Sequence, residues 1–144
     1  MILRRLAYIS IASHPMGDPE LRALLKSCRH ANSRLRISGY LHYHQGEFIQ
    51  VLEGPETSVG ECFERIKHDT RHHNIRVLFD ERTHRRTFAN WSMGCTCETT
   101  MPPSLLRRVE AGFDKLRSLD HVMSTQVLLL FDQLMQTGQL HEAA

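Results

Sequence analysis

The first 98 residues alternate between two spacings of apolar side chains, one with a period of two and one with a helical period. Stretches with a period of two, or apolar on both sides, predict strands. Gln45-Gly46 separates two of them and predicts a short hairpin. The predicted strands are 6–11, 37–44, 47–53, 75–80 and 91–97. In the last of these, one side is expected to carry Trp91, Met93, Cys95 and Cys97.

Helical spacing follows two start signals in this part of the chain. Asp18-Pro19 predicts a helix whose cap is the aspartate, and Gly54-Pro55 opens a second helix. The apolar face of the first helix has the spacing i, i+3, i+4 and i+7, at Leu21, Leu24, Leu25 and Cys28. The second helix has a matching face at Val59, Cys62, Phe63 and Ile66.

The pair Pro102-Pro103 ends this pattern, because proline continues neither a strand nor a helix. Only helical spacing remains after it, which predicts two tail helices. We therefore expect a domain over residues 1–98 and a two-helix extension over residues 99–144. The first tail helix has apolar positions at Leu105, Leu106, Val109, Phe113 and Leu116, and the second at Val127 to Phe131, Leu134 and Met135.

The element order is βαββαββ, which predicts an α+β fold of the ferredoxin-like sandwich type with two C-terminal helices. The two helices of the sandwich would cover one face of the sheet. The other face needs different cover, and the tail helices are the candidates for it. The second tail helix could instead form a dimer contact.

Composition narrows the class of protein. The chain has 144 residues, of which 41% are hydrophobic and 24% charged, as in one ordinary globular domain. A formal net charge of +2 gives no support for a nucleic-acid-binding or polybasic membrane-binding protein. Four scattered cysteines, no signal peptide and no long apolar run predict a reduced, cytoplasmic protein that makes no membrane contact.

Polar residues at apolar strand positions are the candidates for chemistry. Gln50 shares a strand face with Phe48 and Leu52, and Tyr8 lies in the middle of the first strand. Each could also be structural, Gln50 as an amide that bridges backbone groups and Tyr8 as an ordinary strand tyrosine. Asn32 is expected just past the last turn of the first helix, where asparagine is a common C-terminal cap.

Ten histidines raise the question of a metal site. His42 and His44 would share the outward face of one strand and could reach a common metal, and Cys95 and Cys97 also share a face. Neither pair has the spacing of a structural zinc site. The chain also carries no phosphate-binding glycine loop and no nucleophile motif. We therefore expect no metal site and no catalytic residues.

A set of short blocks, in order and with characteristic spacing over residues 3 to 97, resembles the BLUF domains, which are flavin-binding sensors of blue light. Each block is weak alone, but the ordered set is specific. The blocks are Leu6-Ala7-Tyr8-Ile9-Ser10, Asn32 before Ile37-Ser38-Gly39, Phe48-Ile49-Gln50-Val51-Leu52-Glu53-Gly54-Pro55, Ile66, Asp69-Thr70-Arg71-His72, Arg85-Arg86-Thr87-Phe88 and Trp91-Ser92-Met93-Gly94.

The resemblance implies that FAD, or else FMN or riboflavin, binds with its ring between the two sandwich helices. Asn32 would bind the imide edge of the ring, Arg71 would donate to a ring carbonyl, and Asp69 would lie on the ribityl side with His72. The full set of flavin-binding residues that the resemblance implies is Tyr8, Ser10, Leu24, Leu25, Asn32, Phe48, Gln50, Ile66, Asp69, Arg71, His72 and Met93.

The same resemblance implies a photochemical pair. Light would excite the flavin, Tyr8 would donate an electron and then a proton, and the Gln50 amide would end rearranged. Stronger hydrogen bonding to the ring would shift the absorption to the red. Trp91 and Met93 are alternative neighbours of Gln50 that would pass the change into the last strand, and which of them faces the flavin stays open.

No effector domain is recognisable after residue 103, so the resemblance implies a receptor that turns over no substrate. It would signal to a separate effector protein or through a changed homo-oligomer, a dimer or larger. An alternative is a ferredoxin-like enzyme acting on a small phosphorylated or acyl substrate through Arg71, His72 and Asn32. A third is an RNA-recognition sandwich, although the basic, aromatic sheet-face signature of that module is missing.

Overall fold

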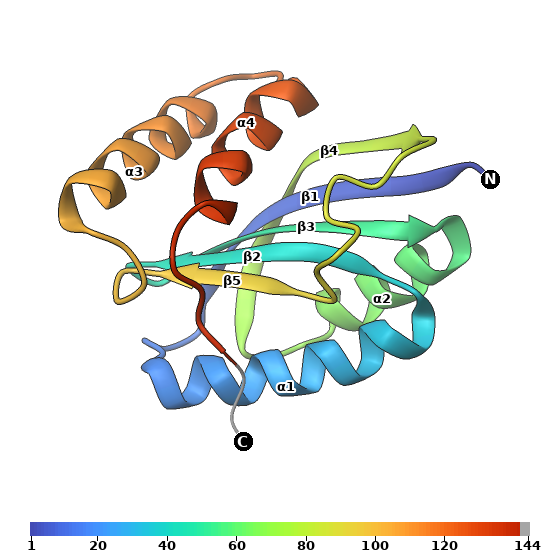
Figure 1. The fold of residues 1–144 in the computed structure, drawn as a ribbon, viewed down its shortest axis with the longest axis horizontal. Coiled ribbons are helices and arrows are strands. Elements are labelled where there is room, and N and C mark those ends of the chain that lie inside the picture. The colour runs from blue at the N-terminus through green and yellow to red at the C-terminus, as the bar shows by residue number, and fades with distance from the viewer. Residues whose placement is uncertain (142–144) are drawn as a thin grey trace.

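The computed structural model describes residues 1–141 and confirms the predicted order of elements. The ferredoxin-like part consists of five strands and two helices, and two further helices follow it (Figure 1). The elements are β1 (Leu3–Ala12), α1 (Asp18–Leu35), β2 (Ser38–His44), β3 (Glu47–Pro55), α2 (Glu56–Lys67), β4 (His72–Thr83), β5 (Gly94–Cys97), α3 (Pro103–Arg117) and α4 (Ser124–Met135).

The five strands form one sheet with the order β4-β1-β3-β2-β5. The pairs β1–β3, β1–β4 and β2–β3 are antiparallel, whereas β5 lies parallel to β2. The register places Tyr8 opposite Gln50 at the centre of the sheet and pairs His42 with Thr96 at its edge. The predicted hairpin turn at Gln45 and Gly46 is present, and both residues have positive φ angles, as such turns require.

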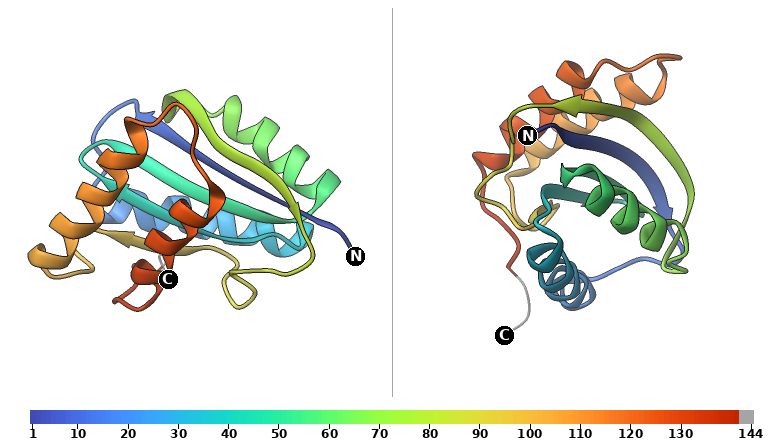
Figure 2. Two further views of the ribbon diagram at one scale, coloured as in Figure 1. Left: turned by 90° about the horizontal axis from the view of Figure 1, so that it is seen from above. Right: turned by 90° about the vertical axis from the view of Figure 1, so that its right-hand side faces the viewer.

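The sheet separates two hydrophobic cores, one on each face. Helices α1 and α2 cover one face and α3 and α4 cover the other (Figure 2). On the α3–α4 side, Val109, Phe113 and Phe131 pack against Tyr40 and Val51 of the central strands. The expectation that the tail helices cover the second face is therefore confirmed. We call α3 and α4 together the cap.

The last strand is shorter than predicted. It begins at Gly94, and residues 91–93 belong to the connection from β4. The backbone there is irregular, because the Trp91 N–H donates to the Phe88 carbonyl and the Trp91 carbonyl accepts from Gly39. The prediction that Trp91 and Met93 share one side of a strand is wrong, since Met93 lies in the α1–α2 core and Trp91 packs against the cap-side core.

Helix α1 is longer than its apolar face suggested. Its N-cap is Gly17 rather than Asp18, and its C-cap is Arg36, which has a left-handed backbone conformation. Asn32 therefore lies inside the last turns of the helix, and its prediction as a C-terminal cap side chain is wrong. Its backbone carbonyl accepts the N–H of Ile37, and its side chain is buried.

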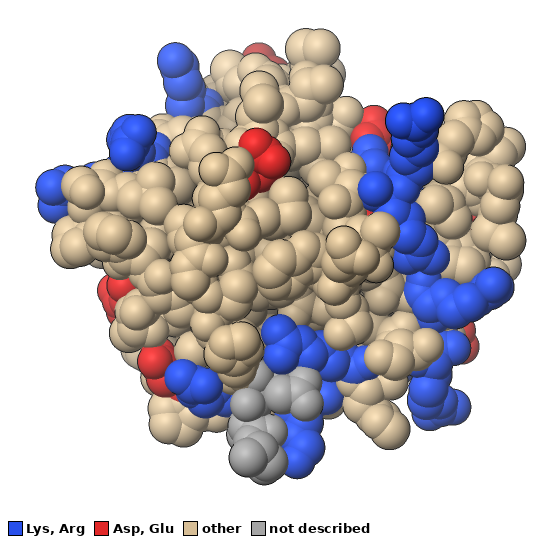
Figure 3. Space-filling model, viewed as in Figure 1, with Lys and Arg blue, Asp and Glu red and all other residues tan. Residues whose placement is uncertain are grey.

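The surface over α4 is poor in charge. In Figure 3, basic side chains gather along the right-hand side, with smaller groups at the upper left and the bottom, whereas the centre, in front of α4, is mostly uncharged. Helix α4 contains one charged residue, Asp132, and its Leu129 side chain is exposed. Within residues 1–141, no helix is both long enough and apolar enough to cross a membrane.

Candidate functional site

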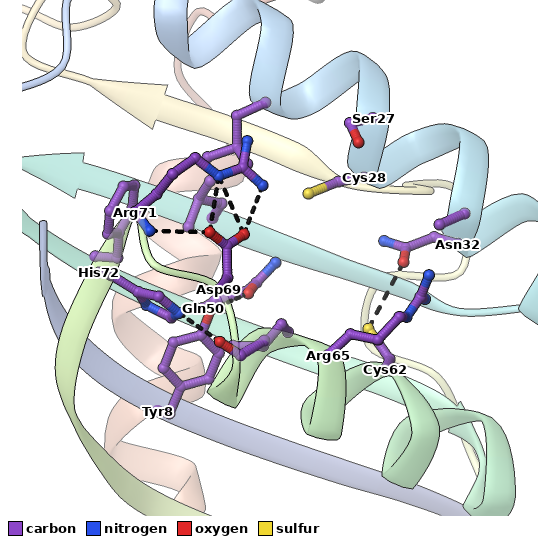
Figure 4. A pocket seen from close by; sticks show the side chains of 15 residues that line it. Tyr8, Ser27, Cys28, Asn32, Gln50, Cys62, Arg65, Asp69, Arg71 and His72 are labelled. Atoms are coloured by element: carbon purple, nitrogen blue, oxygen red, sulfur yellow. Dashed lines mark hydrogen bonds and ion pairs between the residues drawn. The ribbon is translucent and has the colours of Figure 1, made fainter. Parts of the chain in front are cut away.

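A pocket of about 240 Å³ lies between α1, α2 and the sheet (Figure 4). Its walls are mostly apolar, with polar groups at defined points, which is the usual composition of a small-molecule site. Asn32 and Cys62 lie toward one end, and Asp69 and Arg71 toward the other. The lining residues are Tyr8, Leu24, Ser27, Cys28, Ala31, Asn32, Leu41, Phe48, Gln50, Cys62, Arg65, Ile66, Asp69, Arg71 and His72.

A chain of hydrogen bonds starts at the floor of the pocket and leads to the segment before β5. The Tyr8 hydroxyl donates a short hydrogen bond to Gln50 Oε1. The other end of the amide, Gln50 Nε2, donates to Met93 Sδ at 3.4 Å. Burial raises the pKa of Tyr8 well above its ordinary value, so the phenol keeps its proton. The two ends of the Gln50 amide thus face a donor and an acceptor.

Asn32 connects the pocket to the same segment by a second route. Its Nδ2 donates to the Ser92 carbonyl at 3.0 Å, and its Oδ1 accepts from the Cys62 thiol at 3.9 Å. One turn earlier on α1, Arg29 Nε donates to the Met93 carbonyl at 2.9 Å. Two side chains of α1 therefore hold consecutive carbonyl groups of the β4–β5 connection.

Arg71 is held in place by Asp69. The guanidinium bonds both carboxylate oxygens, at 2.5 to 3.0 Å, and the Arg71 backbone N–H also donates to Asp69 Oδ1 at 3.0 Å. These hydrogen bonds hold the pKa of Asp69 below its usual range despite the opposing effect of partial burial. The pair therefore stays ionised at neutral pH and keeps a fixed cation at the rim of the pocket.

His72 is bound on both sides of its ring. Its Nε2 lies 2.6 Å from the Ile66 carbonyl, and its Nδ1 lies 2.7 Å from Ser10 Oγ. Because a carbonyl only accepts, Nε2 carries a proton. In the neutral ring, Nδ1 then accepts the hydroxyl hydrogen of Ser10. His72 thus ties β4 to the end of α2 and to β1, and it presents its ring, rather than a free nitrogen, to the pocket.

Most of the residues that the sequence put forward as flavin-binding come together in this pocket. Nine of the twelve line it, and the other three are Ser10, Leu25 and Met93. Ser10 bonds His72, Met93 bonds Gln50, and Leu25 is fully buried in the core beneath α1. These three support lining residues, so their expected direct contact with a ligand stays a prediction.

Six lining residues were not put forward from the sequence: Ser27, Cys28, Ala31, Leu41, Cys62 and Arg65. A signal existed for two of them, because Cys28 and Cys62 lie on the predicted apolar faces of the two helices. Burial raises the pKa of the Cys28 thiol to about 11, so it is protonated and apolar in character at neutral pH. No sequence pattern pointed to the other four.

Trp91 lies away from the pocket. Its ring packs at 5.7 Å, edge to face, against Tyr40 on the cap side of the sheet. In this structure Met93, and not Trp91, is therefore the neighbour of Gln50. The role of Trp91 in signalling stays a prediction, and it would have to act from the opposite face of the sheet.

His42 and His44 do share the outward face of β2, and their rings stack at 6.4 Å. Both nitrogens of His42, however, have protein partners, Thr96 and Glu110. Within residues 1–141, no group of three or more histidine, cysteine, aspartate or glutamate side chains is placed to hold a metal ion.

The fold and the pocket together define a ferredoxin-like domain with a small-molecule site: a slot between two helices, with the Gln50 amide on the sheet beneath it. Comparison with known families specifies which one. Residues 3–94 match the family model BLUF, described as sensors of blue-light using FAD. The match covers more than half of the chain, and the protein belongs to this family.

Relatives and solved structures agree with this assignment. The chain is 31% identical over 134 residues to the photoactivated adenylate cyclase subunit beta of Euglena longa, a match that covers 89% of this chain and 15% of that protein. It is 32% identical over 131 residues to the alpha subunit of Euglena gracilis, covering 87% and 13%. The chain thus spans less than a sixth of the length of these curated relatives.

Among solved structures, BlsA in its photo-activated state matches with a TM-score of 0.77 and 26% identity, over 96% of this chain and 98% of that chain. The dark-state structure of the BLUF protein BlrB matches with a TM-score of 0.72 and 27% identity, over 92% and 94%. A bacterial light-regulated adenylyl cyclase matches with a TM-score of 0.72 and 29% identity, over 88% and 36%.

Proposed function

We propose that this chain is a blue-light photoreceptor in which Tyr8 and Gln50 form the switch and Met93 receives its output. The observation that carries this proposal is the continuous chain of hydrogen bonds from the Tyr8 hydroxyl through the Gln50 amide to the Met93 sulfur. An amide has one donor end and one acceptor end, so exchanging them gives two distinct arrangements of the same side chain.

The residues of the pocket fit a flavin. Its ring system is flat and largely apolar, and the slot between α1 and α2 offers apolar walls with an amide at one end and a cation at the other. Asn32 would bind the imide edge, exchanging its weak contact with the Cys62 thiol for a stronger one. Arg71, fixed by Asp69, would donate to a ring carbonyl. We propose FAD as the form bound, with FMN and riboflavin as alternatives.

A bound flavin would supply the absorption of blue light and, in its excited state, an acceptor for one electron and one proton. Tyr8 is the donor closest to Gln50, and its raised pKa means that the proton leaves its hydroxyl only after the electron does. When Tyr8 Oη is briefly without its proton, Gln50 Oε1 loses its donor. The amide is then free to turn or to tautomerise. Return of the electron and the proton to Tyr8 restores its hydroxyl, which holds the amide in the new arrangement.

Met93 carries the change out of the pocket. Once the amide has turned, Gln50 Nε2 can no longer donate to Met93 Sδ, so the Met93 side chain loses its hydrogen-bond partner. Met93 directly precedes β5, and the segment that follows α4 is bonded to β5, because the Leu140 N–H donates to the Cys95 carbonyl. We propose that the last strand and the cap pass the signal to a separate effector protein, and that the chain itself is a homo-oligomeric receptor rather than an enzyme. Light scattering in darkness and under blue light measures the mass of the protein and thereby its oligomeric state.

An absorption spectrum before and after blue light tests the proposal. We expect the purified protein, reconstituted with FAD where necessary, to be yellow and to show a small red shift that reverses in the dark. Tyr8→Phe and Gln50→Leu should abolish the shift while flavin stays bound. Tyr43→Phe is the matched control, since it removes a phenol hydroxyl from the same buried face outside the pocket. A normal red shift in Gln50→Leu would refute the mechanism.

The alternatives from the sequence find less support. An enzyme that uses His72 as acid or base needs a free ring nitrogen, and both nitrogens are hydrogen-bonded to protein groups. An RNA-recognition sandwich reads nucleotides on an open sheet face. Here α1 and α2 lie on one face of the sheet and the cap lies on the other.

A further inference from the structure

His42 is a buried histidine that belongs to neither the pocket nor the family pattern. It lies in β2, and its side chain points to the cap side of the sheet with 1% of its surface exposed. Its Nδ1 lies 2.9 Å from Thr96 Oγ1 on β5, and its Nε2 lies 2.8 Å from Glu110 Oε1 on α3. Its ring also stacks on Phe113 of α3, with 5.6 Å between centroids. One side chain thus bridges the edge strand and the first cap helix.

The charges around His42 favour this bridge. Burial opposes ionisation of Glu110, but the hydrogen bond from His42 and the electrostatic interactions with His42, His44 and Arg117 hold the pKa of Glu110 below the usual range. An ionised carboxylate only accepts, so His42 Nε2 carries a proton and donates. Two further acids lie on this face. Glu98 is exposed and lies 3.8 Å from His44, and Glu47 forms an ion pair with Arg117 of α3 at 2.6 Å.

His42 also lies at the end of the route that leaves the pocket. Met93 accepts from Gln50, and β5 begins at the next residue. Thr96 follows three positions after Met93, is fully buried, and pairs with His42 in the register of the two strands. A shift of β5 along β2 must therefore change the Thr96–His42 bond, since one Oγ1 atom supplies it.

We propose that His42 is the positioning residue that transmits the state of the pocket to α3. In the dark, the Thr96–His42–Glu110 bonds hold α3 on the sheet. When the Gln50 amide turns and Met93 moves, β5 shifts, His42 loses its fixed orientation, and its bond to Glu110 weakens. Helix α3 then separates from the sheet more often. This inference rests on the proposed function, because it needs the light-driven movement of Met93.

The test uses the full chain loaded with FAD and measures two quantities in darkness and under blue light. The first is the red shift of the flavin, which reports the pocket. The second is hydrogen exchange of the α3 backbone amides, which reports separation of the cap. His42→Phe keeps the stack on Phe113 and removes both hydrogen bonds. Glu110→Gln removes only the charge, and Glu98→Gln is the control beside the other histidine of the strand.

In the unmodified protein, we expect light to raise α3 exchange. In His42→Phe, dark exchange should already be raised about tenfold, equivalent to about 1.4 kcal/mol, and light should add nothing while the red shift persists. Glu110→Gln should show a smaller version of the same effect, and it decides the matter if His42→Phe does not fold. Glu98→Gln should behave as the unmodified protein.

Two results would overturn the inference, and they are distinguishable. A normal red shift together with an undiminished light response of α3 in His42→Phe and Glu110→Gln removes His42 from the route but leaves the photoreceptor intact. Absence of a red shift in the unmodified, flavin-loaded protein overturns the proposed function, and the inference with it.

Discussion

Phe131→Ala should destabilise the whole protein and not the cap alone. The Phe131 side chain on α4 has no exposed surface. Its ring lies 5.7 Å from that of Tyr40 on β2, 6.0 Å from Phe88 in the β4–β5 connection and 5.9 Å from Phe113 on α3. These contacts join the cap to the sheet. If the cap shares its core with the sensor in this way, the two parts unfold together.

The size of the effect follows from burial. Truncating a fully buried phenylalanine typically costs about 3–5 kcal/mol, and for a domain of this length roughly 3 °C of melting temperature is lost per kcal/mol. We therefore expect a decrease of roughly 12 °C, about 4 kcal/mol of unfolding free energy. Leu129→Ala, two residues earlier on the same helix and 66% exposed, should change the free energy by less than about 0.5 kcal/mol.

Urea unfolding followed by two signals measures this. Circular dichroism reports helix content, and fluorescence of the single tryptophan, Trp91, reports the cap side of the sheet beside Tyr40. Both signals should give one coincident transition in each variant. A separate early transition for the helices, with a later transition unaffected by Phe131→Ala, would contradict the shared core.

Three further predictions concern the pocket and its neighbours. Met93→Leu, which removes the sulfur acceptor of Gln50, should leave the flavin red shift in place and reduce the light response of α3 exchange; an unchanged response would exclude this route. Because Arg71 lowers the pKa of Asp69, the ion pair is fully formed above the ordinary pKa of a carboxyl, and it is lost as the pH falls through the lowered pKa. FAD affinity by fluorescence titration should therefore fall in acid, and Asp69→Asn should weaken it at neutral pH and remove that pH dependence. Gly39→Ala should cost about 3 kcal/mol or more in urea unfolding, because a Cβ there would overlap the Val51 carbonyl; near-normal stability would show that β2 can move aside.

The fold was predictable because its signals are local and strong. The hairpin at Gln45 and Gly46 and the apolar faces of the helices were each visible in the sequence, and the structure confirms them. The ends of elements were less predictable. Helix α1 continues past its apolar face to Leu35 and ends there because Arg36 adopts a left-handed backbone conformation. Arginine is not a residue type that predicts this conformation.

The candidate site was predictable where its residues follow regular spacing, and the prediction failed where the backbone is irregular. Gln50 lies in an unbroken strand, and its placement at the floor of the pocket agrees with a period of two. Trp91 and Met93 also have a spacing of two residues in the sequence. The connection that contains them is held by hydrogen bonds to Phe88 and Gly39, and the alternation restarts only at β5. Side-chain direction in such a segment depends on tertiary contacts, which local periodicity does not encode.

The histidines show how placement, rather than residue type, decides function. His72 falls in a family motif, yet its ring is bound on both sides and serves to fix β4. His42 matches no motif, yet it joins β5 to α3 inside the protein. Stability alone does not account for that arrangement, because buried polar groups paired with one another contribute little more than apolar side chains of the same shape. What a hydrogen-bonded histidine adds is a defined geometry that one displaced partner disrupts. A leucine at this position would fill the same space and remain packed when β5 moved.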